Sequence, residues 1–237
     1  MKKILAINPV GTDIWDESDY SYFKKHASGD TEVEVVSLKD GPESVESYYL
    51  EAYASPRVLD IIKNADGRYD GFLVNCFADP GVRAAREITD VPVIGPGEAS
   101  MLTASMLGHK FGVAAINKKQ VTALEIKVME MGIIQRFAGA RAVNIGVSSL
   151  LDAPQETVEE VIKAADFLIG ERGAEVIVLG CTGMAYLAEE IKKRLTVPVI
   201  EPALTALKLL ETLIDMGLTH SKEALYSNPF KKQKEGD

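Results

Sequence analysis

Cysteine is scarce in this chain, with two residues, Cys76 and Cys181, in a sequence of 237. Two cysteines in a chain of this length do not form a disulfide framework, and a reducing cytosol would keep both as thiols. A Cys-x-x-Cys pair is absent, so the sequence carries no thioredoxin-like redox motif. The three histidines, His26, His109 and His220, lack the spacing of a metal site, and we expect no bound metal.

Long apolar runs and an excess of basic residues are also missing. No apolar stretch approaches the roughly 18–20 residues of a membrane span, and the apolar run after Met1 is too short for a signal peptide. The net charge of −9 opposes a nucleic-acid-binding surface. No dinucleotide fingerprint or lysine-bearing cofactor motif occurs. We therefore expect a cytoplasmic protein without a cofactor, whose partner is a small molecule rather than nucleic acid or a membrane.

Two segments of the chain, 70–96 and 175–202, repeat the same order of features. Each has an apolar run, then a cysteine, a charged helical run and a Val-Pro-Val-Ile string. The cysteines are 105 residues apart and the strings 106 residues apart. An Ala-Ile-Asn string also ends an apolar run at Asn8 and again at Asn117, 109 residues later. Matches in the same order at nearly the same offset indicate an internal duplication, so we predict two related lobes that each present one thiol.

Apolar runs alternate with helical segments along the chain. The runs from Ile4 to Ile7 and from Phe111 to Ile116 are unbroken, as is typical of parallel strands covered on both faces. Strands that alternate with helices of about ten or more residues indicate βαβ units with right-handed crossovers. We predict an α/β protein of two pseudosymmetric lobes, 1–97 and 98–203, each a parallel four-stranded sheet flanked by helices. The segment 204–230 is expected to pack back on the first lobe.

Three local predictions depend on weaker signals. Ser55-Pro56 is expected to open a helix that continues to about Asn64, and Arg141 to Val147 is predicted as a weak strand. The tyrosines at 48, 49 and 53 are expected to pack between the lobes, although one of them could close over the site.

Each cysteine follows a predicted strand and precedes a predicted helix. Free N–H groups at a helix start favour negative charge, so we expect a lowered pKa for both thiols. Four backbone N–H groups beside the cysteines could hold a developing oxyanion. They belong to Phe77, Ala78, Thr182 and Gly183. Two thiols facing each other across a cleft would suit stereoinversion, in which one thiolate removes a proton from a carbon next to a carbonyl and the opposite thiol returns one to the other face.

The weak acidity of such a carbon limits this chemistry. A thiolate is a modest base, so much depends on oxyanion stabilisation, where one donor contributes about 2.7–4 kcal/mol. A cyclic imide or ureide is already activated and demands less of the enzyme. Two other interpretations of the cysteines stay open: small buried hydrophobic residues, and a redox disulfide across the cleft.

Five strings of the sequence carry a family resemblance. They are INPVGT at 7–12, ESVESYYLEAYASP at 43–56, NCFADPGVRAAREI at 75–88, VPVIGPGEASMLTASMLGHKFGV at 91–113 and VLGCTGMA at 178–185. Together they resemble the aspartate/glutamate racemase superfamily, and most closely its hydantoin racemase branch, which includes allantoin racemases. The resemblance covers nearly the whole chain.

The resemblance implies a cofactor-independent racemase with its site in the cleft between two pseudosymmetric lobes. Cys76 and Cys181 would be the two bases, and Asn8, Thr12 and the amides beside each cysteine would contact the substrate ring. The implied reaction inverts C5 of a 5-substituted hydantoin, or of a related ureide such as allantoin, by proton transfer between the two thiols. Such enzymes are usually homo-oligomers.

Departures from the family pattern leave the substrate open. Amino-acid racemases of the superfamily typically have Cys-Asn-Thr and Cys-Thr-His where this chain has Cys76-Phe77-Ala78 and Cys181-Thr182-Gly183, which disfavours a free amino acid. The hydantoin branch commonly has Asn-Thr-Ser or Asn-Thr-Thr after Asn-Pro, whereas Val10-Gly11-Thr12 follows here. The alternatives are an amino-acid or dicarboxylate racemase or isomerase, and a non-catalytic ligand-binding protein with the same bilobal cleft.

Overall fold

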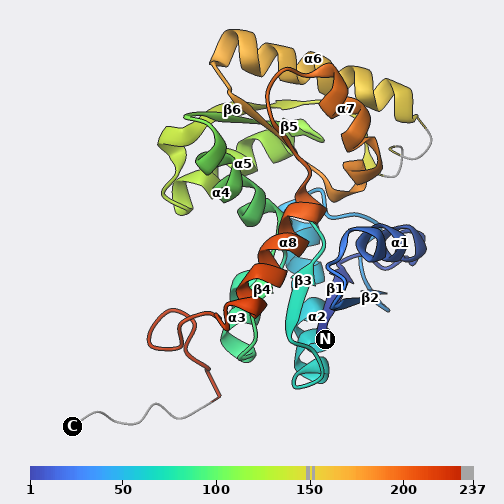
Figure 1. Cartoon of the computed structure of the whole chain (residues 1–237), viewed down its shortest axis with the longest axis vertical. Helices are drawn as coiled ribbons and strands as arrows, with labels where there is room; N and C mark the ends of the chain where they lie inside the picture. Colours follow the sequence, from blue (N-terminus) through green and yellow to red (C-terminus); the bar gives the residue numbers. More distant parts are fainter. Residues whose placement is uncertain (148–149, 151–152, 231–237) are drawn as a thin grey trace.

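The computed structural model describes residues 1–147, 150 and 153–230, and its strands form two parallel four-stranded sheets (Figure 1). The strand orders are β2-β1-β3-β4 and β6-β5-β7-β8. The first sheet and its helices comprise β1 (Lys2–Asn8), α1 (Asp16–His26), β2 (Thr31–Ser37), α2 (Tyr48–Ala65), β3 (Gly71–Val74), α3 (Val82–Ile88), β4 (Val93–Ile94) and α4 (Pro96–Leu107). The second sheet and its helices comprise β5 (Phe111–Ala115), α5 (Lys118–Glu130), η1 (Ile134–Arg136), β6 (Phe137–Ala142), α6 (Pro154–Arg172), β7 (Val176–Leu179), η3 (Thr182–Leu187), α7 (Ala188–Arg194) and β8 (Val199–Ile200). The last helix, α8 (Pro202–Asp215), returns to the first sheet.

The predicted fold class is confirmed, and the two sheets repeat one topology. β3 lies between β1 and β4 in the first sheet, as β7 lies between β5 and β8 in the second. Cys76 follows β3 and Cys181 follows β7, so the two thiols stand at equivalent strand ends.

Helices cover both faces of each sheet, which explains the unbroken apolar runs. Leu5 and Ile7 of β1 join a core cluster with α2 and α3, whereas Ile4 and Ala6 join another with α1 and α8. The second sheet lies between α6 and α7 on one face and α4 and α5 on the other. Leu210 of α8 lies so close to β3 that a Cβ on Gly71 would come within 2.8 Å of its side chain.

Helix α4 lies at the junction of the lobes (Figure 1). Ala99, in its first turn, packs in the core cluster of the first sheet, while Met101 and Ala104 pack in a cluster of the second. The same short helix is therefore part of both cores. None of the described helices is long and apolar enough to cross a membrane.

The predicted start of α2 was wrong, because the helix begins at Tyr48 and contains Pro56. Ser47 caps it by accepting the N–H of Leu50. Proline has no N–H to bond the carbonyl four residues earlier. That carbonyl belongs to Ala52, an exposed residue, so water can replace the missing donor.

The predicted strand at 141–147 was also displaced, since β6 begins at Phe137. β6 is an edge strand that pairs with β5, and its sequence, FAGARA, lacks an apolar pattern. Its pairing shifts register between Phe111 and Gly112, and Gly139 has a φ of 130°. An irregular edge strand needs little apolar surface, which is why the sequence signal was weak.

Candidate active site

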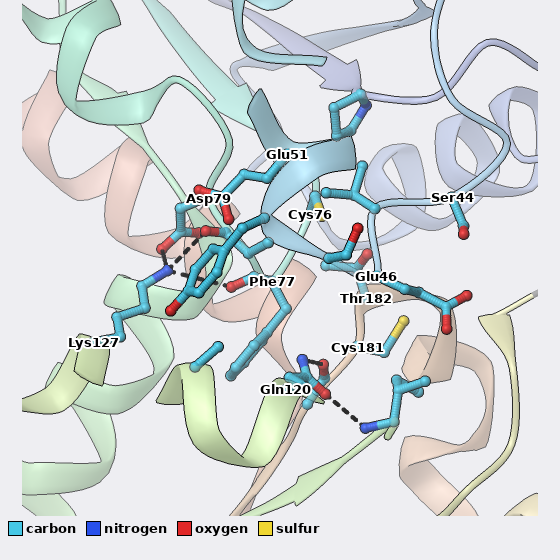
Figure 2. A pocket seen from close by; sticks show the side chains of 18 of the residues that line it. Ser44, Glu46, Glu51, Cys76, Phe77, Asp79, Gln120, Lys127, Cys181 and Thr182 are labelled. Carbon is cyan, nitrogen blue, oxygen red and sulfur yellow. Dashed lines mark hydrogen bonds and ion pairs between the residues drawn. The ribbon is translucent and has the colours of Figure 1, made fainter. Parts of the chain in front are cut away.

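A cavity of about 1000 Å³ lies between the lobes, where strands of both sheets end. Asn8 ends β1, and Cys76 and Cys181 follow β3 and β7; all three line the cavity. In open α/β sheets, ligands bind outside the carboxyl ends of the strands. The duplicated topology thus brings both thiols to one space, and Figure 2 shows the two cysteine loops facing the same cavity.

A hydrogen bond ties the two cysteine loops together. The Thr182 hydroxyl donates to the carbonyl of Asn75 at 3.4 Å, joining the residues next to Cys181 and Cys76. Before Cys181, the close packing of Gly180 fixes the loop, because a Cβ there would lie 2.5 Å from the carbonyl oxygen of Ala114. The lobes therefore meet directly at the thiols.

The expectation that both cysteines precede a helix holds in part. Cys76 is followed by a turn, and α3 begins only at Val82. Asp79 within this turn has a φ of 59°, in the left-handed region. Cys181 directly precedes the short 3₁₀-helix η3.

The expected lowering of the thiol pKa values was wrong. Burial raises the pKa of Cys76 and that of Cys181 to about 12. The backbone N–H groups of Ala78 and Gly183 bond the two sulfurs and act in the opposite direction, but with a smaller effect. Removing a thiolate from water costs more free energy than one hydrogen bond from a backbone N–H returns.

Asn8 belongs to a polar network under the cavity. Its side chain donates to Asp16 at 2.9 Å and accepts from the amide of Asn75 at 2.9 Å. The Asn75 amide also donates to Asp19 at 3.1 Å. Burial raises the pKa of Asp19 to about 6. This network fixes the orientation of Asn8 and Asn75 at the cavity wall.

Of the predicted site residues, Thr12 is not brought to this cavity. It lines a separate hollow beside the end of β2. The N–H of Gly11 bonds the carbonyl of Pro42 at 2.8 Å, which draws the loop toward β2. Pro9 and Val10 line the main cavity instead. The remaining predicted residues all line it: Asn8, Cys76, Phe77, Ala78, Cys181, Thr182 and Gly183.

The tyrosines and the histidines lie differently with respect to the cavity. Tyr48 and Tyr49 line the cavity but are 60% and 76% exposed, so they do not pack between the lobes. The histidines all lie within the described residues, and none lines the cavity. Within the described part of the chain, no group of three or more His, Cys, Asp or Glu residues could hold a metal ion.

Comparison with known proteins identifies the family. A model of the family described as Asp/Glu/Hydantoin racemase matches residues 4–210. The chain belongs to the Asp/Glu/hydantoin racemase family. The membership predicted from the five strings is confirmed, and so is the assignment of the chain to the isomerases as a racemase.

Relatives of this racemase match it over almost its full length. It is 38% identical to a hydantoin racemase of Pseudomonas sp. (strain NS671), over 98% of this chain and 93% of the relative. A solved allantoin racemase from Pseudomonas fluorescens superposes with a TM-score of 0.92 at 32% identity, covering 99% of this chain and 100% of the other. A solved allantoin racemase from Klebsiella pneumoniae superposes with a TM-score of 0.90 at 33% identity, covering 100% of this chain and 97% of the other.

On the Cys181 side, two further residues line the racemase cavity that were not predicted from the sequence. Glu46, from the loop before α2, accepts the side-chain amide of Asn117 at 3.2 Å and the N–H of Val147 at 3.4 Å. It thus reaches from the first lobe to the second, beside Cys181 (Figure 2). Gln120 of α5 joins the N–H of Ile116 to the carbonyl of Gly180. Glu46 falls within the family-like strings, but nothing in the sequence indicates its contacts.

On the Cys76 side, the racemase places an ion pair that the sequence also did not reveal. Lys127 of α5 contacts Asp79 at 2.6 Å, and Asp79 accepts the N–H groups of Gly97 and Glu98 at 2.8 Å each (Figure 2). Asp79 thereby caps the start of α4. Both charged residues line the cavity wall next to the Cys76 loop.

Proposed function

We propose that this racemase inverts C5 of 5-substituted hydantoins, or of a related ureide such as allantoin, by proton transfer between Cys76 and Cys181 without a cofactor. The observation that carries the proposal is the placement of both thiols at equivalent strand ends on one cavity. The relatives named hydantoin racemase and allantoin racemase support this class of substrate.

The proposed reaction needs one thiolate and one thiol. The thiolate takes the proton from C5, the C–H electron pair moves onto the neighbouring carbonyl oxygen, and the opposite thiol gives its proton to the other face of C5. The sulfurs end with their protonation states exchanged. Charge on Cys181 raises the pKa of Cys76, so the pair is disfavoured from losing both protons.

Backbone amides would stabilise the enolate oxygen. The N–H groups of Ala78 and Gly183 already bond the sulfurs, so this role is proposed for the N–H groups of Phe77 and Thr182. One such donor is worth about 2.7–4 kcal/mol in the transition state. A ring held against the wall formed by Asn8 and Asn75 would present its carbonyl to these groups.

The charges of the cavity favour a neutral ring over an amino acid. Asp19, Glu46 and Glu51 place carboxyl groups on its wall. Of the three basic residues that line the cavity, Lys127 and Arg83 are already paired with Asp79 and Glu130, and Lys119 is exposed. A substrate carboxylate would meet repulsion here, which counts against an amino-acid or dicarboxylate racemase. The volume of about 1000 Å³ leaves room for a bulky group on C5.

Racemisation measured on thiol variants tests the proposal. Loss of optical rotation and solvent-deuterium uptake at C5 are followed for each pure enantiomer of a hydantoin panel and of allantoin, after subtraction of the rate without enzyme. We expect wild type to racemise at least one of them and Cys76→Ser and Cys181→Ser to lose racemisation. Undiminished racemisation by either variant would contradict the two-thiol mechanism. Ligand binding without deuterium uptake would favour the non-catalytic alternative.

The assembly, location and division of the chain are part of the same proposal. We propose a homo-oligomer, supported by the exposed apolar side chains of Leu102, Met106 and Leu107 on α4, to be tested by light scattering.

A cytoplasmic location agrees with the two free thiols. Lobes of 1–97 and 98–203, with 204–230 on the first, agree with the packing of α8 against β3. Limited proteolysis would test these boundaries.

A further inference from the structure

Lys127 reaches from α5 to the loop that carries Cys76. Its ammonium group lies 3.4 Å from the carbonyl oxygen of Phe77, 3.0 Å from that of Ala78 and 2.6 Å from the carboxylate of Asp79 (Figure 2). The lysine side chain is 21% exposed and that of Asp79 7% exposed. A cation held by three oxygens with little water around it is firmly positioned.

One peptide group connects this lysine to the sulfur of Cys76. The carbonyl of Phe77 and the N–H of Ala78 belong to the same peptide, and hydrogen bonding from this N–H lowers the pKa of Cys76. A cation on the oxygen of a peptide polarises its N–H group, which then binds an anion more strongly. Lys127 therefore favours the thiolate of Cys76 through the peptide as well as directly through space.

The surrounding packing leaves the lysine little freedom. Asp79 binds both Lys127 and the start of α4, so three segments meet at this ion pair. A Cβ on Gly97 would lie 2.1 Å from the Phe77 carbonyl oxygen, so the α4 backbone presses against the peptide that Lys127 contacts. The peptide cannot rotate away without displacing α4.

The charged groups around the two sulfurs differ. Asp79 and Cys181 disfavour the Cys76 thiolate and Lys127 favours it, while Glu51 and Glu130 are further acidic groups near the ion pair. Around Cys181, the charges with the largest effects are acidic, and each raises the pKa of the thiol. They are Glu46, Asp19 and Glu201.

We propose that Lys127 is a positioning residue that holds the Cys76 loop and favours the thiolate of Cys76 through the Phe77–Ala78 peptide. The use of this thiolate as a base in racemisation rests on the proposed function. The effect of Lys127 on Cys76 does not, because it concerns a thiol that can be titrated without substrate.

Alkylation of a single remaining thiol tests the proposal. In full-length Cys181→Ser protein, the rate of reaction with iodoacetamide and the thiolate absorbance near 240 nm are recorded against pH. We expect Lys127→Met to slow alkylation of Cys76 at neutral pH on the order of tenfold, the equivalent of about one pKa unit. Lys127→Arg should restore most of the rate. Lys118→Met, at an exposed lysine of the same helix, should leave it unchanged.

Two further measurements separate this role from a general loss of structure. In Cys76→Ser protein, Lys127→Met should leave the alkylation of Cys181 unchanged. Asp79→Asn removes the carboxylate that opposes the thiolate and should speed alkylation of Cys76; it decides the matter if Lys127→Met does not fold. The proposal would be overturned if Lys127→Met left the pH profile of Cys76 alkylation unchanged, or shifted the profiles of both thiols equally. Slower alkylation of Cys76 in Asp79→Asn would also overturn it. These outcomes hold whether or not the protein racemises hydantoins.

Discussion

The two cysteine loops have one backbone plan and different electrostatic surroundings. Both follow the equivalent strand of a four-stranded sheet, and both are held by a side chain of α5. The Cys76 loop is held by the cation of Lys127, whereas the Cys181 loop is held by the neutral amide of Gln120. The duplication therefore conserved the positions of the thiols while their charge environments diverged. A reaction that treats both faces of a carbon alike can therefore use two unlike bases.

The largest expected effect comes from removing one thiol. With the proposed mechanism, Cys76→Ser and Cys181→Ser should each lower the racemisation rate by at least 10²-fold, the usual contribution of a general base. The remaining thiol still faces one side of C5. Each variant should therefore exchange deuterium into one enantiomer without inverting it, and the two variants should prefer opposite enantiomers. Proton NMR in D₂O checks this, and exchange into both enantiomers by one variant would contradict it.

A large effect on stability is expected at the residue before Cys181. Asn75 precedes Cys76 and uses its side chain in the polar network, but Gly180 precedes Cys181 with no space for one. Gly180→Ala should lower the free energy of unfolding by about 1–3 kcal/mol through overpacking. Gly170→Ala, in helix α6 with no atom within 4 Å of the new Cβ, should be neutral or stabilising. Thermal melts of the two variants check the difference.

Glu46 should influence one thiol alone. Its carboxylate faces Cys181 and is the largest charge effect that raises the pKa of this thiol. Glu46→Gln keeps an acceptor for Asn117 and removes the charge, so Cys181 should be alkylated about threefold to tenfold faster in Cys76→Ser protein. The matched measurement on Cys76 in Cys181→Ser protein should show no change. Acceleration of both thiols would mean that the loop has opened instead.

The smallest effect is a pH dependence caused by Asp19. Burial raises its pKa to about 6, so it is protonated below this pH and ionised above it. Once ionised, it disfavours the Cys181 thiolate. The pH profile of Cys181 alkylation should therefore bend near pH 6, with a reduced slope through the titration of Asp19, and Asp19→Asn should remove the bend and speed alkylation at pH 7 about threefold. A bend that persists in this variant would exclude Asp19 as its source.

Much of the fold was predictable from the sequence because the duplication repeats both an apolar pattern and its spacing. Equal offsets place Cys76 and Cys181 on equivalent strands, and parallel strands of one topology end at the same cavity. The start of α2 was missed because a proline inside a helix is rare; it is tolerated here where Ala52, the residue whose carbonyl lacks its donor, is exposed.

The remaining features of the site depend on contacts that no local pattern encodes. Thr12 turns away because Gly11 packs against residues about thirty positions later, at Gly41 and Pro42. Lys127 is one of several lysines on its helix, and only the fold brings it to the Cys76 loop. The raised thiol pKa values arise from burial between the lobes, which a helix-start argument does not include.

The sharing of helix α4 by both cores limits how substrate can enter. With Ala99 anchored in one lobe and Met101 and Ala104 in the other, a hinge motion of the lobes would have to disrupt two packed interiors at once. The segment before α2 packs against the core of the first lobe through Val45 and reaches the second lobe through the two hydrogen bonds of Glu46. We therefore expect movement of the segment before α2 to control substrate entry, while the two lobes keep their relative positions.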